Sequence, residues 1–338
     1  MRTVREAVVP AGRSAELIPL LFSEGIADPS ARITGDDGCR LVPIMEGAEG
    51  AVRAMGLEIA EGPAHSEGSR PPMERIRDAL AGLPPDALRK LPEKWETAGS
   101  TVSVKMDPSL EEYSEEIGRA FASALGKGTV LADVSGVSGE LRRPGMRVLY
   151  GSPGESVKLE NGIRYCFDAT KVMFASGNLD ERRRMGQLDC RGETVVDMFA
   201  GIGYFALPLA RFAYPRRLFA CEKNPDSYEF LVKNVVLNGV GDRVIPILTD
   251  NRSLPGRAFA DRILMGYVQT TSEFIPKALE LAKPGCIIHY HDTFPEGKQE
   301  ESVDAAFSRY RGSYEVIAIR EVKSFAPGVS HYVADVRV

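Results

Sequence analysis

A glycine-rich turn and two acidic side chains stand at spacings that suit the binding of a nucleotide. Asp197 opens the segment DMFAGIG, in which Gly201 and Gly203 allow the backbone to approach a ligand. The helix expected after this turn would offer its free N–H groups to the same ligand. Glu222 ends the next expected strand, about 20 residues further on, where a carboxylate accepts hydrogen bonds from both hydroxyls of a ribose.

A further polar pair completes the predicted nucleotide site. Asp250 and Asn251 end the following expected strand, where the edge of an adenine would lie. An NAD-dependent oxidoreductase would share Glu222 but has no particular need of Asp197, whose charge would lie where the pyrophosphate approaches. The pattern therefore favours S-adenosylmethionine over NAD. In the purely structural alternative, Asp197 and Glu222 are strand-end carboxylates that only cap helices.

The segment DRILMGYV, residues 261–268, departs from the pattern of enzymes that methylate a base nitrogen. Those enzymes carry Asn or Asp, two prolines and an aromatic residue here, which hold the amino nitrogen of the base. This chain has Met265, Gly266 and Tyr267 instead. Because a carbon nucleophile offers no such nitrogen, we expect Met265, Gly266 and Tyr267 to make room for a repositioned methionine arm or for the base, with Met265 and Gly266 as ligand contacts. Alternatively, Met265 fills the core and Gly266 only forms a turn.

Two histidines near the end of the chain could act in proton transfer. His289 and His291 lie at alternate positions of an expected strand and therefore on one face. With Asp292 they could suggest a metal site, but a strand-end pair without a third ligand is weak evidence for zinc. The five cysteines are scattered and suggest reduced core thiols. We predict no metal, leave the catalytic base unassigned, and keep open both a proton relay through His291 and a structural role.

The composition is that of an ordinary globular protein. The chain has 338 residues, 43% of them hydrophobic and 26% charged, with a net charge of -5. This charge argues against an unusually basic, non-specific nucleic-acid binder. Residues 142–191 nevertheless carry ten Lys or Arg and six Asp or Glu, a local balance of +4. No run of 18 apolar residues and no signal-peptide core are found, so we expect a cytoplasmic protein that makes no contact with a membrane.

The sequence predicts four segments. Residues 1–60 form a small β-α-β unit, and residues 61–92 form a linker rich in Pro and Gly with one short helix at 73–80. Residues 93–155 form an α+β domain. Residues 156–338 begin with a hairpin at Asn161-Gly162 and then alternate strands with helices. That alternation predicts a doubly wound parallel sheet. Two final strands without a helix between them predict an antiparallel edge, as in class I S-adenosylmethionine-dependent methyltransferases.

Several motifs resemble those of one family of transfer-RNA-modifying enzymes. From residue 91 to residue 338 the chain resembles the archaeal tRNA wybutosine-synthesizing protein 2 family, which is related to the tRNA guanine-N1-methyltransferases acting at position 37. The marks are "FDATKVMFASGNLDERRRM", "VVDMFAGIGYF", "CEKNPDSYEFLVKNVVLN", "DNR", "DRILMGYV", "FIPKALELAKPGCIIHYHDT" and "FAPGVSHYVADVRV". "RILMGYV" followed by "IIHYH" is the most specific part. Residues 1–60 are similar, more weakly, to the small first domain of the methyltransferases.

The resemblance implies an activity and a donor. The enzyme would transfer the 3-amino-3-carboxypropyl group of S-adenosylmethionine to C-7 of 4-demethylwyosine at position 37 of phenylalanine tRNA, releasing 5′-methylthioadenosine. At the methionine end, the family pattern Ser-Pro-x-Asn stands here as 175–178, with the serine displaced by one place to Ser176 and the proline absent. Ser176 remains a candidate contact, and Arg182 would pair with the carboxylate of the transferred group.

The partner implied is the anticodon region of the tRNA, with no obligate protein partner. Phosphate contacts would come from basic residues, and the tricyclic base would stack on Tyr267 or Phe325. The basic candidates are Arg142, Arg143, Arg147, Arg182, Arg183 and Arg184, and residues 93–155 are the candidate tRNA-contact domain. Two alternatives stay open: a guanine-N1-methyltransferase at position 37, and a non-catalytic RNA module that binds S-adenosylmethionine.

Overall fold

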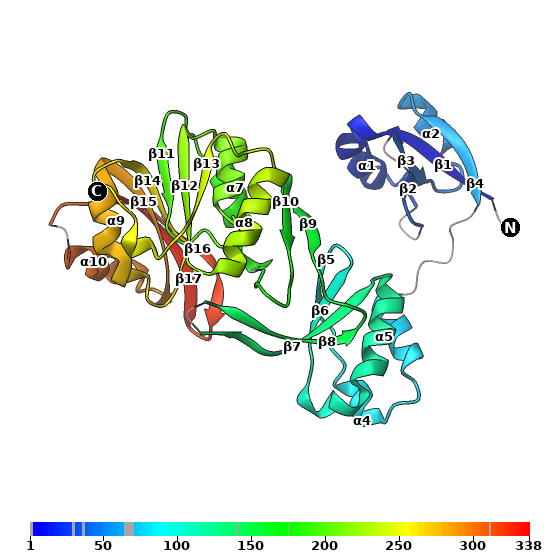
Figure 1. Cartoon of the computed structure of the whole chain (residues 1–338). Coiled ribbons are helices and arrows are strands. Elements are labelled where there is room, and N and C mark those ends of the chain that lie inside the picture. The colour runs from blue at the N-terminus through cyan, green and yellow to red at the C-terminus, as the bar shows by residue number, and fades with distance from the viewer. Residues whose placement is uncertain are drawn as a thin grey trace. The chain divides into compact units, whose positions relative to one another are not determined.

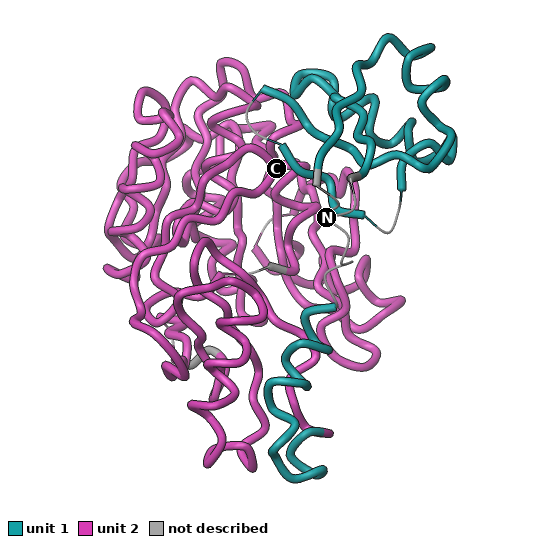
Figure 2. The backbone as a smooth tube through the Cα atoms, turned by 90° about the vertical axis from the view of Figure 1, so that its right-hand side faces the viewer, with its two compact units in different colours: residues 1–88 teal, residues 89–338 magenta. Residues whose placement is uncertain are grey.

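The computed structural model describes residues 3–28, 31–35, 38–63, 71–139, 141–174, 176–310 and 312–338. The chain divides into two compact units, residues 1–88 and residues 89–338 (Figure 2). Each unit is described by itself. Residues 64–70 of the predicted linker lie outside the described residues.

The first unit is an antiparallel sheet with the strand order β2-β3-β1-β4. The predicted strands and helix are present, but the structure adds helix α2 and strand β4, which pairs with β1 along its length. The first unit therefore contains more elements than the predicted β-α-β unit. The elements are β1 (Thr3–Pro10), α1 (Ser14–Ser23), β2 (Thr34–Gly35), β3 (Cys39–Pro43), α2 (Glu49–Ala54) and β4 (Glu58–Pro63), followed by α3 (Pro72–Ala79) and α4 (Pro85–Arg89).

The second unit begins with a four-stranded sheet in the order β5-β6-β7-β8. Helix α5 covers it and ends at Gly126, whose φ of 63° is the left-handed conformation that glycine adopts without strain. Strands β7 and β8 form a long hairpin (Figure 1). The elements are β5 (Trp95–Ala98), β6 (Thr101–Lys105), α5 (Ser114–Leu125), β7 (Thr129–Ser138) and β8 (Arg143–Tyr150). A two-stranded hairpin follows, β9 (Ser156–Glu160) and β10 (Ile163–Phe167), with Asn161 and Gly162 at positive φ in its turn.

The rest of the unit is built on a seven-stranded sheet in the order β13-β12-β11-β14-β15-β17-β16. The first five strands of that order are parallel, and β17 is antiparallel to both β15 and β16. This confirms the predicted parallel sheet with an antiparallel edge. The strands are β11 (Thr194–Asp197), β12 (Arg217–Glu222), β13 (Val244–Leu248), β14 (Ala260–Met265), β15 (Ala282–Pro295), β16 (Glu315–Ala326) and β17 (Val329–Arg337). The helices are α6 (Leu179–Gly186), α7 (Ala206–Pro208), α8 (Pro225–Leu237), α9 (Ile275–Leu281) and α10 (Gln299–Ser308).

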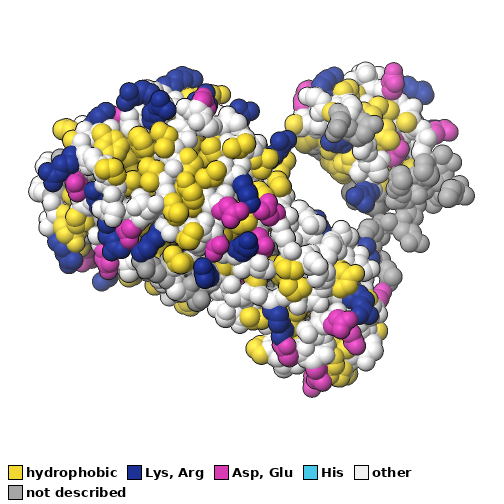
Figure 3. All heavy atoms as spheres, viewed as in Figure 1, with side chains coloured by type: hydrophobic (Ala, Val, Ile, Leu, Met, Phe, Trp, Pro, Cys, Tyr) yellow, Lys and Arg dark blue, Asp and Glu magenta, His cyan; other side chains and the backbone are white. Residues whose placement is uncertain are grey.

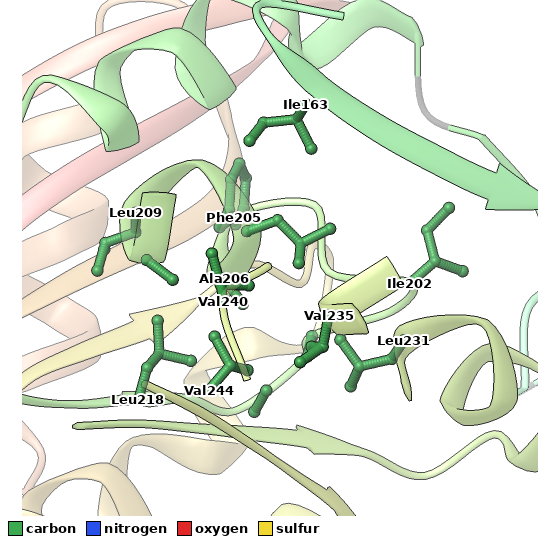
Figure 4. Close-up of a cluster of buried hydrophobic side chains, with 14 of the residues drawn as sticks. Ile163, Ile202, Phe205, Ala206, Leu209, Leu218, Leu231, Val235, Val240 and Val244 are labelled. Atoms are coloured by element: carbon green, nitrogen blue, oxygen red, sulfur yellow. The ribbon is translucent and has the colours of Figure 1, made fainter. Parts of the chain in front are cut away.

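Helix ends follow local chemistry, and two apolar cores hold the helices on the sheet. Asn224 caps α8 by accepting a hydrogen bond from the backbone N–H of Asp226, and Pro225 takes the first helical position. One core includes Phe205, Leu231 and Val244 and is drawn in Figure 4. The other includes Met198, Met265 and Phe307. No helix in the described part of the chain is long and apolar enough to cross a membrane.

Candidate functional site

A cavity of about 370 Å³ opens at the carboxyl edge of the seven-stranded sheet. Small-molecule sites of proteins usually measure about 300–1,000 Å³, so the cavity suits a nucleotide-sized ligand. In a parallel sheet, ligands bind at the carboxyl ends of the strands. Of the ten residues predicted to bind a ligand, five line the cavity: Gly201, Glu222, Asp250, Asn251 and Gly266.

The glycine-rich turn after β11 needs its two glycines for conformation and for space. Gly201 has a φ of 57° and Gly203 a φ of 102°, a region that other residues adopt with strain. A Cβ atom on Gly203 would come within 2.6 Å of Leu207 Cγ. Gly203 therefore lets the following helix pack closely, whereas Gly201 lines the cavity itself.

Asp197 lies beneath this turn rather than in the cavity wall. Its side chain is completely buried, and Oδ1 accepts a hydrogen bond from the backbone N–H of Phe199 at 3.1 Å. Burial raises the pKa of Asp197 to about 7. Its Oδ2 has no hydrogen-bond partner among the described residues. The side chain supports the loop, and its predicted contact with a ligand stays a prediction.

Glu222 ties the two loops of the nucleotide site together. Its Oε2 accepts a hydrogen bond from Gly201 N and its Oε1 one from Asn224 N, both at 2.7 Å. Burial raises the pKa of the Glu222 carboxyl group. The Glu222 carboxylate at the end of β12 is thus fixed in the cavity wall, and its contact with a ribose stays a prediction.

Asp250 and Asn251 form the next part of the wall. Asp250 accepts hydrogen bonds from the Arg252 side chain, which hold the pKa of this carboxyl group well below its ordinary value. Asn251 donates through Nδ2 to Met198 O at 2.9 Å, so its Oδ1 is fixed. That Oδ1 is buried and has no partner among the described residues. An orphaned acceptor in a cavity wall matches the exocyclic amine of an adenine.

The 265–267 segment divides between the core and the cavity. Met265 is fully buried in the apolar core, as the alternative in which it fills the core expects, and its predicted contact with a ligand stays a prediction. Gly266 and Tyr267 line the cavity. A Cβ atom on Gly266 would lie 2.7 Å from Phe205 Cε2. The Tyr267 ring stacks on Phe199, with ring centres 5.1 Å apart and planes at 14°.

Arg182 does not line the cavity. Arg182 is 1% exposed and pairs with Glu160 through Nε and through Nη2, the latter at 3.0 Å. Its guanidinium lies 5.1 Å from the ring centre of Phe174, which lines the cavity. Ser176 begins a short 3-10 helix, and its side chain lies outside the described residues, as does Ala175. Pairing of Arg182 with a substrate carboxylate therefore stays a prediction.

Replacing Glu160 with leucine tests how firmly this buried pair holds the wall. The change leaves the buried Arg182 charge without its carboxylate, and we expect the free energy of unfolding to fall by about 3–5 kcal/mol. Urea denaturation measures the loss. The exposed pair between Arg183 and Asp180 is the control, because replacing Asp180 with asparagine should cost about 1 kcal/mol or less. Equal losses in the two variants would show that the buried pair does not hold the wall.

Three cavity residues were missed as ligand contacts because they arrive from distant parts of the chain. Arg142, at the tip of the β7–β8 hairpin, places its guanidinium 5.8 Å from the Tyr267 ring centre. The hairpin also accepts a hydrogen bond at Leu141 O from Asn224. Lys323 on β16 and His331 on β17 complete the wall. Of the three, His331 lies in the family-like motif at the end of the chain, Arg142 was predicted only as a phosphate contact, and Lys323 lies in none of the motifs.

The two predicted histidines occupy buried positions. His289 is 1% exposed, and its Nδ1 lies 2.6 Å from Asp335 Oδ1 and its Nε2 2.8 Å from Arg262. It therefore has a structural role. His291 is also 1% exposed, and its Nδ1 lies 3.0 Å from Nε2 of the cavity residue His331. The described residues contain no group of three or more His, Cys, Asp or Glu that could hold a metal ion.

Comparisons with known proteins agree with this geometry. Residues 156–316 match the family model of the TRM5/TYW2 methyltransferase domain, and residues 76–154 match that of the TYW2 N-terminal domain. The tRNA(Phe) (4-demethylwyosine(37)-C(7)) aminocarboxypropyltransferase of Pyrococcus horikoshii is 44% identical over 269 residues, 78% of this chain and 96% of that protein. The tRNA (guanine(37)-N(1))-methyltransferase Trm5b of Pyrococcus abyssi is 30% identical over 324 residues, 94% of each chain.

The solved structures give the same result. The crystal structure of P. horikoshii TYW2 in complex with MeSAdo superposes with a TM-score of 0.70 at 41% identity, covering 78% of this chain and 98% of that one. Sequence and fold thus agree over nearly the whole length of that relative. The chain belongs to the archaeal tRNA wybutosine-synthesizing protein 2 family.

Proposed function

We propose that this protein transfers the 3-amino-3-carboxypropyl group of S-adenosylmethionine to C-7 of 4-demethylwyosine in tRNA and releases 5′-methylthioadenosine. The observation that carries the proposal is the 44% identity to an enzyme with this named activity, over 96% of that enzyme. We extend the proposal to position 37 of phenylalanine tRNA. The enzyme works in the cytoplasm without an obligate protein partner.

The cavity residues fit the donor substrate. Glu222 would hold the ribose hydroxyls, and the orphaned Oδ1 of Asn251 would accept from the adenine amine. Gly201 lines the cavity and would let the backbone approach the ligand. The sulfonium of the donor is already activated, so the task of the protein is to present one of its three carbons to the nucleophile. Gly266 is where this choice would be made, because it leaves space that any side chain would fill.

The target base would lie on the other side of the cavity. Tyr267 offers an aromatic plane that is held by stacking on Phe199, and a splayed-out tricyclic base can stack against such a plane. Arg142 reaches the same place from the hairpin. The base is an extended aromatic system, so stacking is the contact best suited to it.

Of the arginines predicted to contact the tRNA backbone, Arg142 lines the cavity. Most of the predicted phosphate contacts are paired with carboxylates in the structure: Arg143 with Asp226, Arg147 with Glu111, Arg183 with Asp180, and Arg184 with Glu181. Arg142 has no carboxylate partner among the described residues. On the face shown in Figure 3, Lys and Arg are interspersed with Asp and Glu. A focused contact at the anticodon region therefore fits better than a broad basic surface.

Methylation of guanine N1 is the second candidate. The similarity to the P. abyssi methyltransferase favours it, because that similarity covers 94% of this chain, whereas the two family models match residues 76–154 and 156–316. The residues at the end of β14 oppose it: Met265, Gly266 and Tyr267 replace the polar group and prolines that hold a base nitrogen.

The nucleoside by-product tests the proposal. The protein is incubated with S-adenosylmethionine and tRNA carrying the tricyclic precursor, and the products are separated by chromatography. We expect methylthioadenosine, formed only with that tRNA. Formation of S-adenosylhomocysteine would establish methyl transfer instead. If neither product forms, the remaining candidate is an RNA module that binds the donor without turning it over.

A further inference from the structure

His331 is a titratable side chain of the cavity wall that the binding of the donor and the base does not use. It lies on β17, is 3% exposed and lines the cavity. Its Nε2 is 3.0 Å from Nδ1 of His291 on β15, a hydrogen-bonding distance. His291 is fixed in turn, because its ring stacks on Phe205 with centres 5.1 Å apart and planes at 22°. Two imidazoles thus run from the cavity into the protein.

A carboxylate stands at the inner end of this pair. Glu181 on α6 places Oε1 3.6 Å from Nε2 of His291, and that nitrogen is buried without a hydrogen-bond partner among the described residues. Arg184 holds both oxygens of Glu181, at 2.6 and 2.8 Å. The three groups therefore line up in the order Glu181, His291, His331, with only the last of them in the cavity wall.

The nearby carboxylate favours one tautomer of each imidazole. At 3.6 Å Glu181 is beyond hydrogen-bonding distance, but its negative charge favours the tautomer of His291 that carries hydrogen on Nε2 and a lone pair on Nδ1. His331 must then donate from Nε2 to His291 Nδ1, and its own Nδ1 keeps a lone pair. This is how a carboxylate sets the tautomer of a catalytic imidazole in the Ser-His-Asp arrangement. The result is a proton acceptor at the cavity end of the pair.

Both imidazoles are neutral at pH 7. Burial, together with the nearby charge of Lys323, lowers the pKa of His331 to about 4. Burial also holds the pKa of His291 well below its ordinary value. Such imidazoles are weak bases, but a carbon that has just been alkylated on a cationic ring is a strong acid, so a weak base is sufficient.

The proposed reaction requires such an acceptor. A bond forms between C-7 and the aminocarboxypropyl carbon while the carbon–sulfur bond breaks. Its electron pair goes to sulfur, leaving neutral methylthioadenosine, and the tricycle carries the positive charge. The C-7 hydrogen then leaves as a proton, and the electrons of the C–H bond return to the ring.

We propose that Nδ1 of His331 accepts this proton, and that His291 and Glu181 hold His331 in the tautomer that can accept it. The inference rests on the proposed aminocarboxypropyl transfer. His331 is then a catalytic residue. His291 and Glu181 are positioning residues, because they act only through His331.

His331→Gln is the first variant, since glutamine keeps the size and hydrogen bonding of histidine but takes no proton. We expect kcat to fall by about 100- to 10,000-fold, with the Kd for S-adenosylmethionine and the Tm near those of the wild type. The matched control is Thr293→Val. Thr293 lies directly opposite His331 on β15 and so shares its face of the sheet, but it does not line the cavity. The control should keep the wild-type rate.

Two further readouts separate proton transfer from a structural role. With deuterium at C-7 of the precursor base, H331Q should show a primary isotope effect on transfer that is larger than that of the wild type. In His331→Ala, added imidazole should restore part of the rate in proportion to its concentration. His291→Asn should lower the rate less, by about 10- to 100-fold, because His331 then loses its preferred tautomer but keeps its lone pair.

The outcomes are distinguishable. A wild-type rate in H331Q would overturn this inference. So would a slow H331Q that shows no isotope effect, if imidazole also fails to rescue H331A. Both outcomes would leave the proposed function standing. If H331Q does not fold, the imidazole series on H331A decides alone. Release of S-adenosylhomocysteine by the wild type would instead reject the proposed function and, with it, the need for this acceptor.

Discussion

Replacing Gly266 with alanine is expected to reduce aminocarboxypropyl transfer by at least about 100-fold, because small misplacements of reacting atoms cost rates of this order. The added Cβ atom would stand 2.7 Å from Phe205 Cε2 and 3.0 Å from its Cδ2. Phe205 is 5% exposed and stacks on His291, so it has little room to withdraw. The methyl group therefore takes cavity space and also displaces the support of His331. Single-turnover formation of methylthioadenosine measures the effect.

The control for this variant is Gly241→Ala. A Cβ atom there would meet only Val235 Cγ1 at 3.8 Å, an ordinary contact. We expect G241A to keep the wild-type rate and G266A to lose about 1–3 kcal/mol of stability from overpacking, which leaves most molecules folded. Undiminished transfer by folded G266A would show that the space beside Phe205 is not used by the substrate.

The second large effect is expected at Glu222. Replacing Glu222 with alanine should weaken the binding of S-adenosylmethionine by at least about 100-fold, because two hydrogen bonds to a carboxylate contribute about 1.5–3 kcal/mol each. The same change removes the acceptor that now holds Gly201 N and Asn224 N, so the loop loses its fixed shape. Isothermal titration calorimetry gives the dissociation constant without any need for the tRNA.

Two companions make the result interpretable. Glu222→Gln keeps one oxygen acceptor and should lose about tenfold in affinity, the equivalent of about 1.4 kcal/mol. Glu229→Gln removes an exposed carboxylate from the same helix that Glu222 precedes and should bind normally. An E222A protein that is folded by thermal melting and binds the donor as tightly as the wild type would refute the ribose role.

Local signals made much of the catalytic sheet predictable. The Asn161-Gly162 turn acts within a few residues and appears in the structure as predicted. The Asn224 cap and the glycine at the end of α5 are equally local features of the structure. Chain order then placed Glu222, Asp250 and Gly266 at one edge of the sheet, because parallel strands end at the same edge. Strand β4 was missed because its sequence, EIAEGP, is short and polar and is stabilised by pairing with β1.

The rest of the site depends on contacts between distant segments. Arg182 was predicted as a ligand contact, and in the structure it pairs with Glu160, on the preceding β9–β10 hairpin. Sequence periodicity does not reveal such a pairing. His331 meets His291 across 40 residues through the register of β15 and β17, which the sequence alone does not give. Met265 lies on the core side of β14, because adjacent residues of a strand face opposite ways and the wall begins only at Gly266.

The most direct test of aminocarboxypropyl transfer follows two labels of S-adenosylmethionine in parallel. One sample carries the label in the carboxyl group of the methionine arm, the other in the methyl group, and each is incubated with the wild-type protein and tRNA containing the tricyclic precursor. If the protein transfers the aminocarboxypropyl group, we expect the carboxyl label to become attached to the tRNA while the methyl label leaves with the thionucleoside. Methyl label on the tRNA, with the carboxyl label left in solution, would contradict it.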